Sequence, residues 1–282
     1  MKIGVSSYSF SPYMKKTGAN YFEICDLAVK MGYDAIEFID LSLDVQPAAS
    51  EAELARDIHD HCEKINLPIA AYTIHADFLN DENEAERVKK KVDIAQILGA
   101  KVLRHDACWK VKENMTWRDV IRQIAPSIRE VAAYAETKGI RTCTENHGYL
   151  LQDADRVEEL IRTVNHKNYG WLVDMGNFLC ADDSPLRAVP IAAPYAFHVH
   201  AKDFLVKPFD ADDPGQGWFP SRNGNFLRGT VAGHGVVPIC RCLETLKNAG
   251  YDGLVSYEFE GMEDNLPALE AALAFLRRVT QT

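Results

Sequence analysis

Short apolar segments alternate with amphipathic segments along the whole chain. Eight apolar runs have the length of a strand, and each is followed by a segment with helical periodicity. The predicted strands cover 2–6, 34–39, 68–74, 101–105, 141–145, 169–174, 195–200 and 252–258. The predicted helices cover 19–31, 50–65, 83–98, 117–138, 153–165, 184–192, 236–249 and 266–279. Asp153 is the expected N-cap of its helix, and Gly32, Gly99, Gly139 and Gly250 each follow a helix as expected of C-terminal caps.

This alternation of strand and helix predicts a parallel sheet. Eight strand–helix units in 282 residues, with no linker between them, fit a (β/α)₈ TIM barrel better than an open doubly wound sheet. No Gly-x-Gly-x-x-Gly follows the first strand and no P-loop is present, which weakens the nucleotide-binding alternatives. We therefore predict a single α/β domain, a TIM barrel spanning 1–282.

One segment interrupts the alternation. Residues 203–235 show no clear periodicity and carry Trp218, Phe219, Arg222 and Arg228. A loop this long in a compact domain is usually functional, so we expect it to act as a lid over the site. The alternative is a surface excursion that packs its own aromatic side chains.

Composition narrows the classes of function. The formal net charge of -10 argues against broad binding to a nucleic-acid backbone, because such proteins usually present a basic surface. No apolar run is long enough for a membrane span, and the N-terminus has the pattern of a strand rather than of a signal peptide. Seven scattered cysteines do not suggest a disulfide framework, so we expect reduced thiols and a cytoplasmic protein.

Acidic and histidine side chains gather where the predicted strands end. In a TIM barrel the active site is built at the carboxyl ends of the strands. Seven of the eight strands end in such a residue: Glu37, His75, His105, Glu145, Asp174, His200 and Glu258. Glu260 is an alternative to Glu258 as the acidic residue at the end of this strand, because both side chains point to the same face. We favour Glu258 because it directly ends the apolar run. Buried without partners, these groups would each cost several kcal/mol, which indicates pairing or metal binding.

Three carboxylates and an imidazole around one barrel axis form a plausible site for a divalent metal. Glu145, Asp174 and Glu258 would supply oxygen ligands, and His200 would supply a nitrogen. This set suits Mn²⁺, Mg²⁺ or Co²⁺, with Zn²⁺ as a further option. His198 points to the same side of its strand as His200, and we expect it mainly as a partner behind the ligands.

These residues give the chain a resemblance to the xylose isomerase-like TIM barrel superfamily, and within it to the sugar phosphate isomerase/epimerase group. The motifs that carry the resemblance are Gly-Tyr-Asp-Ala-Ile-Glu-Phe (32–38), Thr-Glu-Asn-His-Gly (144–148), Val-Asp-Met-Gly-Asn (173–177), His-Val-His-Ala-Lys-Asp (198–203), Gly-His-Gly-Val-Val (233–237) and Tyr-Glu-Phe-Glu (257–260). They extend over essentially the whole chain and are specific for the superfamily, but they say little about the substrate.

The resemblance implies an isomerase or epimerase of carbohydrate metabolism. It places the metal ligands on Glu145, Asp174, His200 and Glu258, with Glu145 and Glu258 also acting as an acid/base pair on a carbon next to a carbonyl. The cation would stabilise the enediolate. The expected contacts with the sugar or sugar phosphate are His75, His105, Asn177, His198, Lys202 and Glu37.

Several alternatives stay open. Asn177 stands where ketose epimerases commonly have a histidine, which leaves room for a dehydratase or lyase acting on a keto-sugar or inosose. An endonuclease IV-like nuclease has similar ligands, but an acidic chain is poorly suited to binding DNA. A barrel that binds a ligand without catalysing a reaction is a third class. The stretch 229–235 fits either a phosphate-binding backbone loop or a turn into the next helix. A homo-oligomer is also possible.

Overall fold

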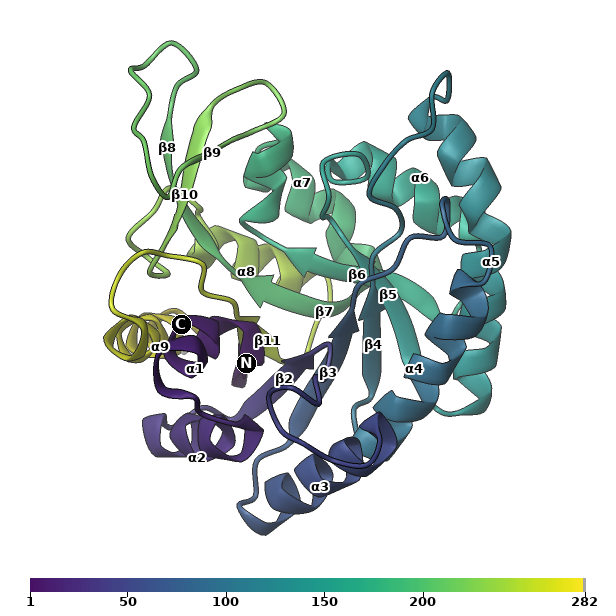
Figure 1. Ribbon diagram of the computed structural model, residues 1–282. Coiled ribbons are helices and arrows are strands. Elements are labelled where there is room, and N and C mark those ends of the chain that lie inside the picture. The colour runs from purple at the N-terminus through teal and green to yellow at the C-terminus, as the bar shows by residue number, and fades with distance from the viewer. Residues whose placement is uncertain (281–282) are drawn as a thin grey trace.

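Eight parallel strands form one closed barrel in the computed structural model, which describes residues 1–280 (Figure 1). The barrel strands are β1 (Ile3–Ser6), β2 (Ala35–Ile39), β3 (Ile69–Ile74), β4 (Val102–His105), β5 (Arg141–Glu145), β6 (Tyr169–Asp174), β7 (Ala196–Ala201) and β11 (Val255–Tyr257). Their order around the barrel is β1-β11-β7-β6-β5-β4-β3-β2, and each neighbouring pair is parallel. The predicted (β/α)₈ fold is therefore confirmed.

Helices surround the barrel, and both ends of the described chain lie on the same side of it, near α1 and α9 (Figure 1). The α-helices are α1 (Ser11–Thr17), α2 (Tyr21–Met31), α3 (Glu51–Lys64), α4 (Glu84–Leu98), α5 (Trp117–Thr137), α6 (Ala154–Val164), α7 (Pro185–Ala192), α8 (Ile239–Asn248) and α9 (Asn265–Thr280). The 3-10 helices within residues 1–280 are η1 (Ser7–Phe10), η2 (Asn177–Ala181) and η3 (Ala193–Tyr195). Of these, α1, η1, η2 and η3 were not predicted.

The helix that carries the predicted cap shows why these segments fold as they do. Helix α6 buries Val157, Leu160, Ile161 and Val164, whose spacing places them on one face toward the barrel. The Asp153 carboxylate accepts a hydrogen bond from the Arg156 backbone N–H at 3.2 Å, which confirms the predicted N-cap. The apolar periodicity and the cap therefore agree on where this helix starts and which side it buries.

The segment 203–235 is more ordered than its lack of periodicity suggested. It forms a three-stranded antiparallel sheet in the order β8-β10-β9, made of β8 (Asp203–Lys207), β9 (Phe219–Pro220) and β10 (Phe226–Thr230). This sheet projects from the barrel at the upper left of Figure 1. Phe204 and Leu227 are buried beneath it with Cys180. The apolar positions are too few in each short strand to produce a recognisable alternation, so the sequence pattern missed them.

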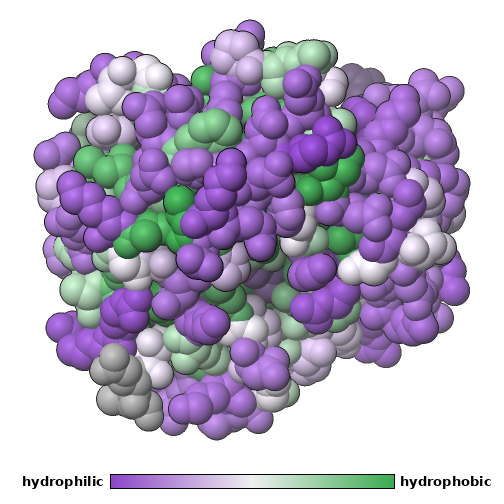
Figure 2. Space-filling model, turned by 90° about the horizontal axis from the view of Figure 1, so that it is seen from below, coloured by the Kyte–Doolittle hydropathy of each residue, from purple (hydrophilic) through white to green (hydrophobic). Residues whose placement is uncertain are grey.

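The outside of the molecule is mainly hydrophilic on the face drawn in Figure 2, where hydrophobic residues form small, separated patches. The core lies instead between the barrel and its helices, and Trp171, Tyr72 and Phe38 are among its largest fully buried side chains. Among residues 1–280, no helix combines the length and the hydropathy needed to cross a membrane.

Candidate metal centre and adjoining cavities

The structure brings Glu145, Asp174, His200 and Glu258 together at the carboxyl end of the barrel. Glu145 and Asp174 are the last residues of β5 and β6, His200 is on β7, and Glu258 follows β11 directly. Potential ligand atoms of all four lie within 4.8 Å of one another. The His200 Nδ1 atom is 3.9 Å from Glu145 Oε1 and 3.8 Å from both Asp174 Oδ2 and Glu258 Oε2. The four ligands proposed from the strand ends therefore face one point.

Two of the converging atoms have no hydrogen-bond partner although they are buried. These are His200 Nδ1 and Asp174 Oδ2. The other oxygen of Asp174 is already held, because Oδ1 accepts the backbone N–H groups of Gly176 at 2.8 Å and Asn177 at 2.9 Å. Unpaired buried polar atoms are costly, and a cation between them would satisfy both. The donor set therefore fits a divalent metal.

Burial and the neighbouring charges also shift the pKa of Asp174. Burial is the main cause of the rise in its pKa to about 6, and the Glu145 and Glu258 carboxylates add to that rise while Lys202 opposes it. Negative charges this close resist ionisation together. A bound cation would remove that penalty, so the electrostatics point to the same occupant as the unpaired atoms.

Glu37 lies behind the centre and holds two histidines. Its Oε1 is 2.8 Å from His200 Nε2, and its Oε2 is 2.6 Å from His198 Nε2. This leaves His200 Nδ1 directed toward the other ligands. Burial raises the pKa of Glu37, but His200 and His198 outweigh it and hold the pKa well below its usual range. Glu37 is fully buried and lines neither of the cavities described below.

Arg104 is a site residue that the sequence analysis missed. Its Nη2 lies 2.7 Å from Glu145 Oε2 and 2.7 Å from Asp106 Oδ1, and the guanidinium is almost fully buried. We had expected His105 at this strand end. Consecutive strand residues point to opposite sides, however, and His105 packs outward against Tyr169 and Phe78. The one sequence feature that could have indicated Arg104 is its position next to His105 on β4, because two adjacent strand residues cannot both face inward.

Lys202 places a buried ammonium group beside the acidic residues. Its Nζ lies 2.5 Å from Glu258 Oε2, 3.3 Å from Glu260 Oε2 and 3.5 Å from Asp174 Oδ2. Burial lowers the pKa of Lys202, but these carboxylates outweigh it and raise the pKa well above its usual value. The same ammonium contacts Asn177 Oδ1 at 3.3 Å, and Asn177 Nδ2 donates to Glu145 Oε1 at 2.8 Å. Lys202 and Asn177 thus hold both glutamates of the centre in place.

Two cavities that share several lining residues open beside the centre. The first, of about 250 Å³, is lined by Tyr8, Ile39, Thr73, His75, Arg104, Trp109, Glu145, His147, His200, Lys202, Glu258 and Glu260. The second, of about 240 Å³, shares Trp109, His147, Lys202 and Glu260 with the first and adds Gly148, Tyr149, Gln152, Asn177, Cys180, Phe204 and Phe219. Among the expected substrate contacts, His75, Asn177 and Lys202 reach these cavities. Glu37, His105 and His198 do not.

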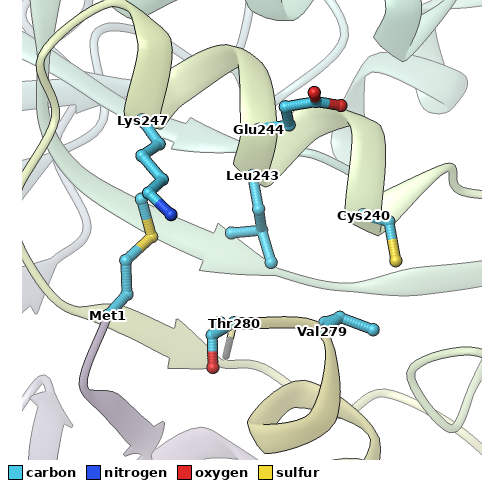
Figure 3. A pocket seen from close by; sticks show the side chains of 7 residues that line it. All are labelled: Met1, Cys240, Leu243, Glu244, Lys247, Val279 and Thr280. Carbon is cyan, nitrogen blue, oxygen red and sulfur yellow. The ribbon is translucent and has the colours of Figure 1, made fainter. Parts of the chain in front are cut away.

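A third cavity lies elsewhere, between α8, the end of α9 and the N-terminus (Figure 3). It measures about 290 Å³ and is lined by Leu243, Glu244 and Lys247 of α8 together with Met1; Leu243 and Lys247 point toward the end of α9 and the N-terminus. Its lining includes none of the four candidate ligands. Among the described residues, three of the four candidate ligands, Glu145, His200 and Glu258, line the first cavity instead.

Residues 25–279 match the family model described as xylose isomerase-like TIM barrel, and the chain belongs to this family. Among curated proteins it is similar to L-ribulose-5-phosphate 3-epimerase UlaE of Escherichia coli, with 24% identity over 279 residues that cover 91% of this chain and 88% of the relative.

Solved structures share the fold over almost the entire chain. The D-psicose 3-epimerase of Clostridium cellulolyticum H10, solved with D-tagatose, is 18% identical with a TM-score of 0.73 and covers 99% of both chains. The IOLI protein, solved with a zinc atom, is 19% identical with a TM-score of 0.79, covering 100% of this chain and 98% of the other. At this level of identity the structural matches establish the fold, and the named curated relative is a sugar epimerase.

Proposed function

We propose that this protein is a divalent-metal-dependent isomerase or epimerase of a keto-sugar. The observation that carries the proposal is the convergence of Glu145, Asp174, Glu258 and His200 on one buried point, where Nδ1 of His200 and Oδ2 of Asp174 have no hydrogen-bond partner. A divalent cation bound there would stabilise the negative charge that develops on the oxygens of the substrate during enolisation. The ligand set favours Mn²⁺, Mg²⁺ or Co²⁺ and also accommodates Zn²⁺.

Glu145 and Glu258 are the proposed acid/base pair. They come from β5 and from the end of β11, and β6 and β7 separate these strands in the barrel, so the two carboxylates reach the centre from different sides. One would take the proton from the carbon next to the carbonyl. The other would return a proton to the opposite face of that carbon, which gives epimerisation, or to the neighbouring carbon, which gives isomerisation.

Neighbouring side chains restrict how the two bases can move. Arg104 and Asn177 each bind a different oxygen of Glu145, at 2.7 Å and 2.8 Å. Glu258 is held by Lys202, and its backbone N–H donates to the Ala201 carbonyl at 3.1 Å. Such fixed positions favour proton transfer to and from carbon, which requires close alignment. The 3-epimerase activities named for the relatives support this reaction class over other uses of the same fold.

A dehydratase is the second candidate, favoured by Lys202. Its ammonium adjoins Glu258 and lines both cavities, where it could protonate a hydroxyl group that leaves from the carbon next to the enolised position. An endonuclease IV-like site has less support. Among the described residues, His75 and His105 remain outside the group of candidate ligands, and the chain is acidic overall.

Metal content and proton exchange test the proposal together. The purified protein should hold about one divalent ion per chain, and it should catalyse deuterium incorporation from D₂O next to the carbonyl of a ketose or keto-sugar. Glu145→Gln and Glu258→Gln should each abolish the exchange. Glu130→Gln, which changes an exposed glutamate on α5, is the matched control.

Product analysis separates the two candidates. Retention of all oxygen atoms indicates isomerisation or epimerisation, whereas loss of water gives an unsaturated product and indicates a dehydratase. Protein that holds no metal, or exchange that survives both glutamine variants, would contradict the proposed chemistry.

A further inference from the structure

The basic side chains that line the two cavities are already paired with carboxylates. Arg104 and Lys202 are the only lysine or arginine residues in either lining. Arg104 lies between Asp106 and Glu145, and Lys202 contacts Glu258, Glu260 and Asp174. Both cations are at least 95% buried. A phosphate group would have to compete with fixed internal carboxylates for either of them, and none of the described lining residues offers a free guanidinium or ammonium group.

The histidines at the rim of the first cavity are paired with the same acid. His147 Nδ1 lies 3.1 Å from Asp106 Oδ1, and His75 Nδ1 lies 3.3 Å from Asp106 Oδ2. Asp106 is also paired with Arg104, so this one carboxylate contacts three basic side chains: Arg104, His75 and His147. A phosphate group would therefore have to compete with the Asp106 carboxylate for either histidine.

The backbone loop that could have held a phosphate is filled by an internal carboxylate. Backbone N–H groups of Gly233, Gly235 and Val237, just before α8, all donate to Asp203 at 2.9 to 3.0 Å. In TIM barrels, phosphates often bind to loops after the last strands and to a nearby helix N-terminus. A Cβ atom on Gly235 would lie only 2.2 Å from Asp203 Oδ1, so the loop closes tightly on this side chain. Of the two interpretations of 229–235, the structure favours the turn.

The remaining cavity wall is acidic and aromatic. Glu260 is part of both linings, and its Oε1 accepts a hydrogen bond from the Tyr8 hydroxyl at 3.2 Å. Trp109 and Tyr149 expose 42% and 45% of their surface beside it. Carboxylate and phenol oxygens can bind sugar hydroxyls, and aromatic faces can cover the apolar face of a sugar. A phosphate dianion in the same position would meet the Glu260 charge.

We propose that the site takes an uncharged polyhydroxylated ketone, a free ketose or keto-sugar, and rejects its phosphorylated counterpart. This assignment rests on the proposed enolisation chemistry and adds the class of substrate. It makes Glu260 a specificity-determining residue. It also separates this chain from L-ribulose-5-phosphate 3-epimerase, whose name specifies a phosphorylated sugar.

Matched pairs of substrates test the assignment. Deuterium exchange is followed by NMR at pH 8 with Mn²⁺-loaded protein on free L-ribulose, D-psicose and D-fructose, and on the phosphate ester of each. For every pair that reacts, kcat/KM should be at least about 100-fold higher for the free sugar, because like charges brought together are strongly unfavourable. Isothermal titration of the same loaded protein with each compound provides a readout that does not depend on turnover.

Charge substitutions then assign the discrimination to Glu260. Glu260→Gln should lower the preference for free over phosphorylated sugar by about 10-fold, and Glu260→Lys should lower it further. The matched control is Glu244→Gln, which removes a carboxylate from the cavity in Figure 3 and should leave the preference unchanged.

The outcomes separate this assignment from the proposed function. Exchange that is equal or faster with the phosphorylated sugars overturns the assignment but leaves the enolisation chemistry intact. A preference for free sugars that Glu260→Lys does not alter removes Glu260 from its proposed role. If no sugar is exchanged but the free members bind more tightly, the specificity stands and the reaction is wrong. Absence of both exchange and binding overturns both proposals.

Discussion

The carboxylate of Glu37 and the imidazole of His200 are joined by a buried contact of 2.8 Å between Oε1 and Nε2. This contact engages the nitrogen of His200 that faces away from the candidate metal centre and directs Nδ1 toward Glu145, Asp174 and Glu258. Residues on β2 and β7 are thereby coupled across the barrel, although they are 163 positions apart in the chain.

Glu37→Gln should weaken metal binding without unfolding the protein. The amide presents an NH2 group in place of one carboxylate oxygen, so either His200 or His198 loses its acceptor. The expected loss in affinity for Mn²⁺ is about 10- to 100-fold, the usual effect of removing such an outer partner. Competition with a fluorescent chelator measures the affinity, and circular dichroism checks the fold. An unchanged affinity would show that Glu37 does not orient His200.

Metal binding should stabilise the protein through the four converging ligands. Adding Mn²⁺ at about 100 times its dissociation constant should raise the free energy of unfolding by about 2.7 kcal/mol. Asp174→Asn should reduce this gain strongly, because it removes a charge beside Nδ1 of His200. Thermal denaturation with and without EDTA gives the comparison, and Glu130→Gln serves as the control. A gain that persists in Asp174→Asn would place the cation elsewhere.

Arg104 should be essential for stability as well as for the position of Glu145. Arg104→Met leaves the carboxylates of Asp106 and Glu145 buried without their common partner. We expect a loss of about 3 to 5 kcal/mol in the free energy of unfolding, as for other broken buried ion pairs. Urea denaturation of the metal-free protein measures it. Adding Asp106→Asn to the variant should recover part of the loss, and an additive double variant would contradict the coupling.

The pairing of His75 with Asp106 should make stability depend on pH in a defined direction. The Asp106 carboxylate raises the pKa of His75 above its usual 6.5, with Asp40 adding to the rise while burial and Arg104 oppose it. A raised pKa in the folded state means that the pairing stabilises the protein fully below about pH 6.5 and is lost as pH rises through the new pKa. The difference in Tm between the wild type and His75→Gln, both in EDTA, should therefore be larger at pH 5.5 than at pH 9. Equal differences would contradict the pairing.

The positions of the four candidate ligands could be inferred from the sequence because two simple rules apply to them. Strands in a parallel barrel end at one face, and a charged residue that ends an apolar run must meet that face. Glu145, Asp174, His200 and Glu258 all follow this pattern. The same rules do not show which of two neighbouring polar residues points inward, and for this reason Arg104 was missed in favour of His105.

Other features depend on contacts between distant segments. Nothing local in 203–235 predicts that β8, β9 and β10 pair with one another, since strands this short gain their stability from partners and from packing against residues such as Cys180. The hydrogen bonds between the Asp203 carboxylate and the backbone of the 233–237 turn likewise join residues about 30 positions apart. Local propensity carries no information on such pairings.

The sequence by itself determined the barrel, its family resemblance and the candidate ligands at the strand ends, because hydrophobic periodicity and the direction of parallel strands are properties of the chain. Only the tertiary structure decided how the charges are paired. It placed Arg104 between Asp106 and Glu145, Lys202 beside Glu258, and Asp203 inside the glycine-rich turn. The strength of an electrostatic interaction depends on distance and burial, and both are set when separate segments pack together.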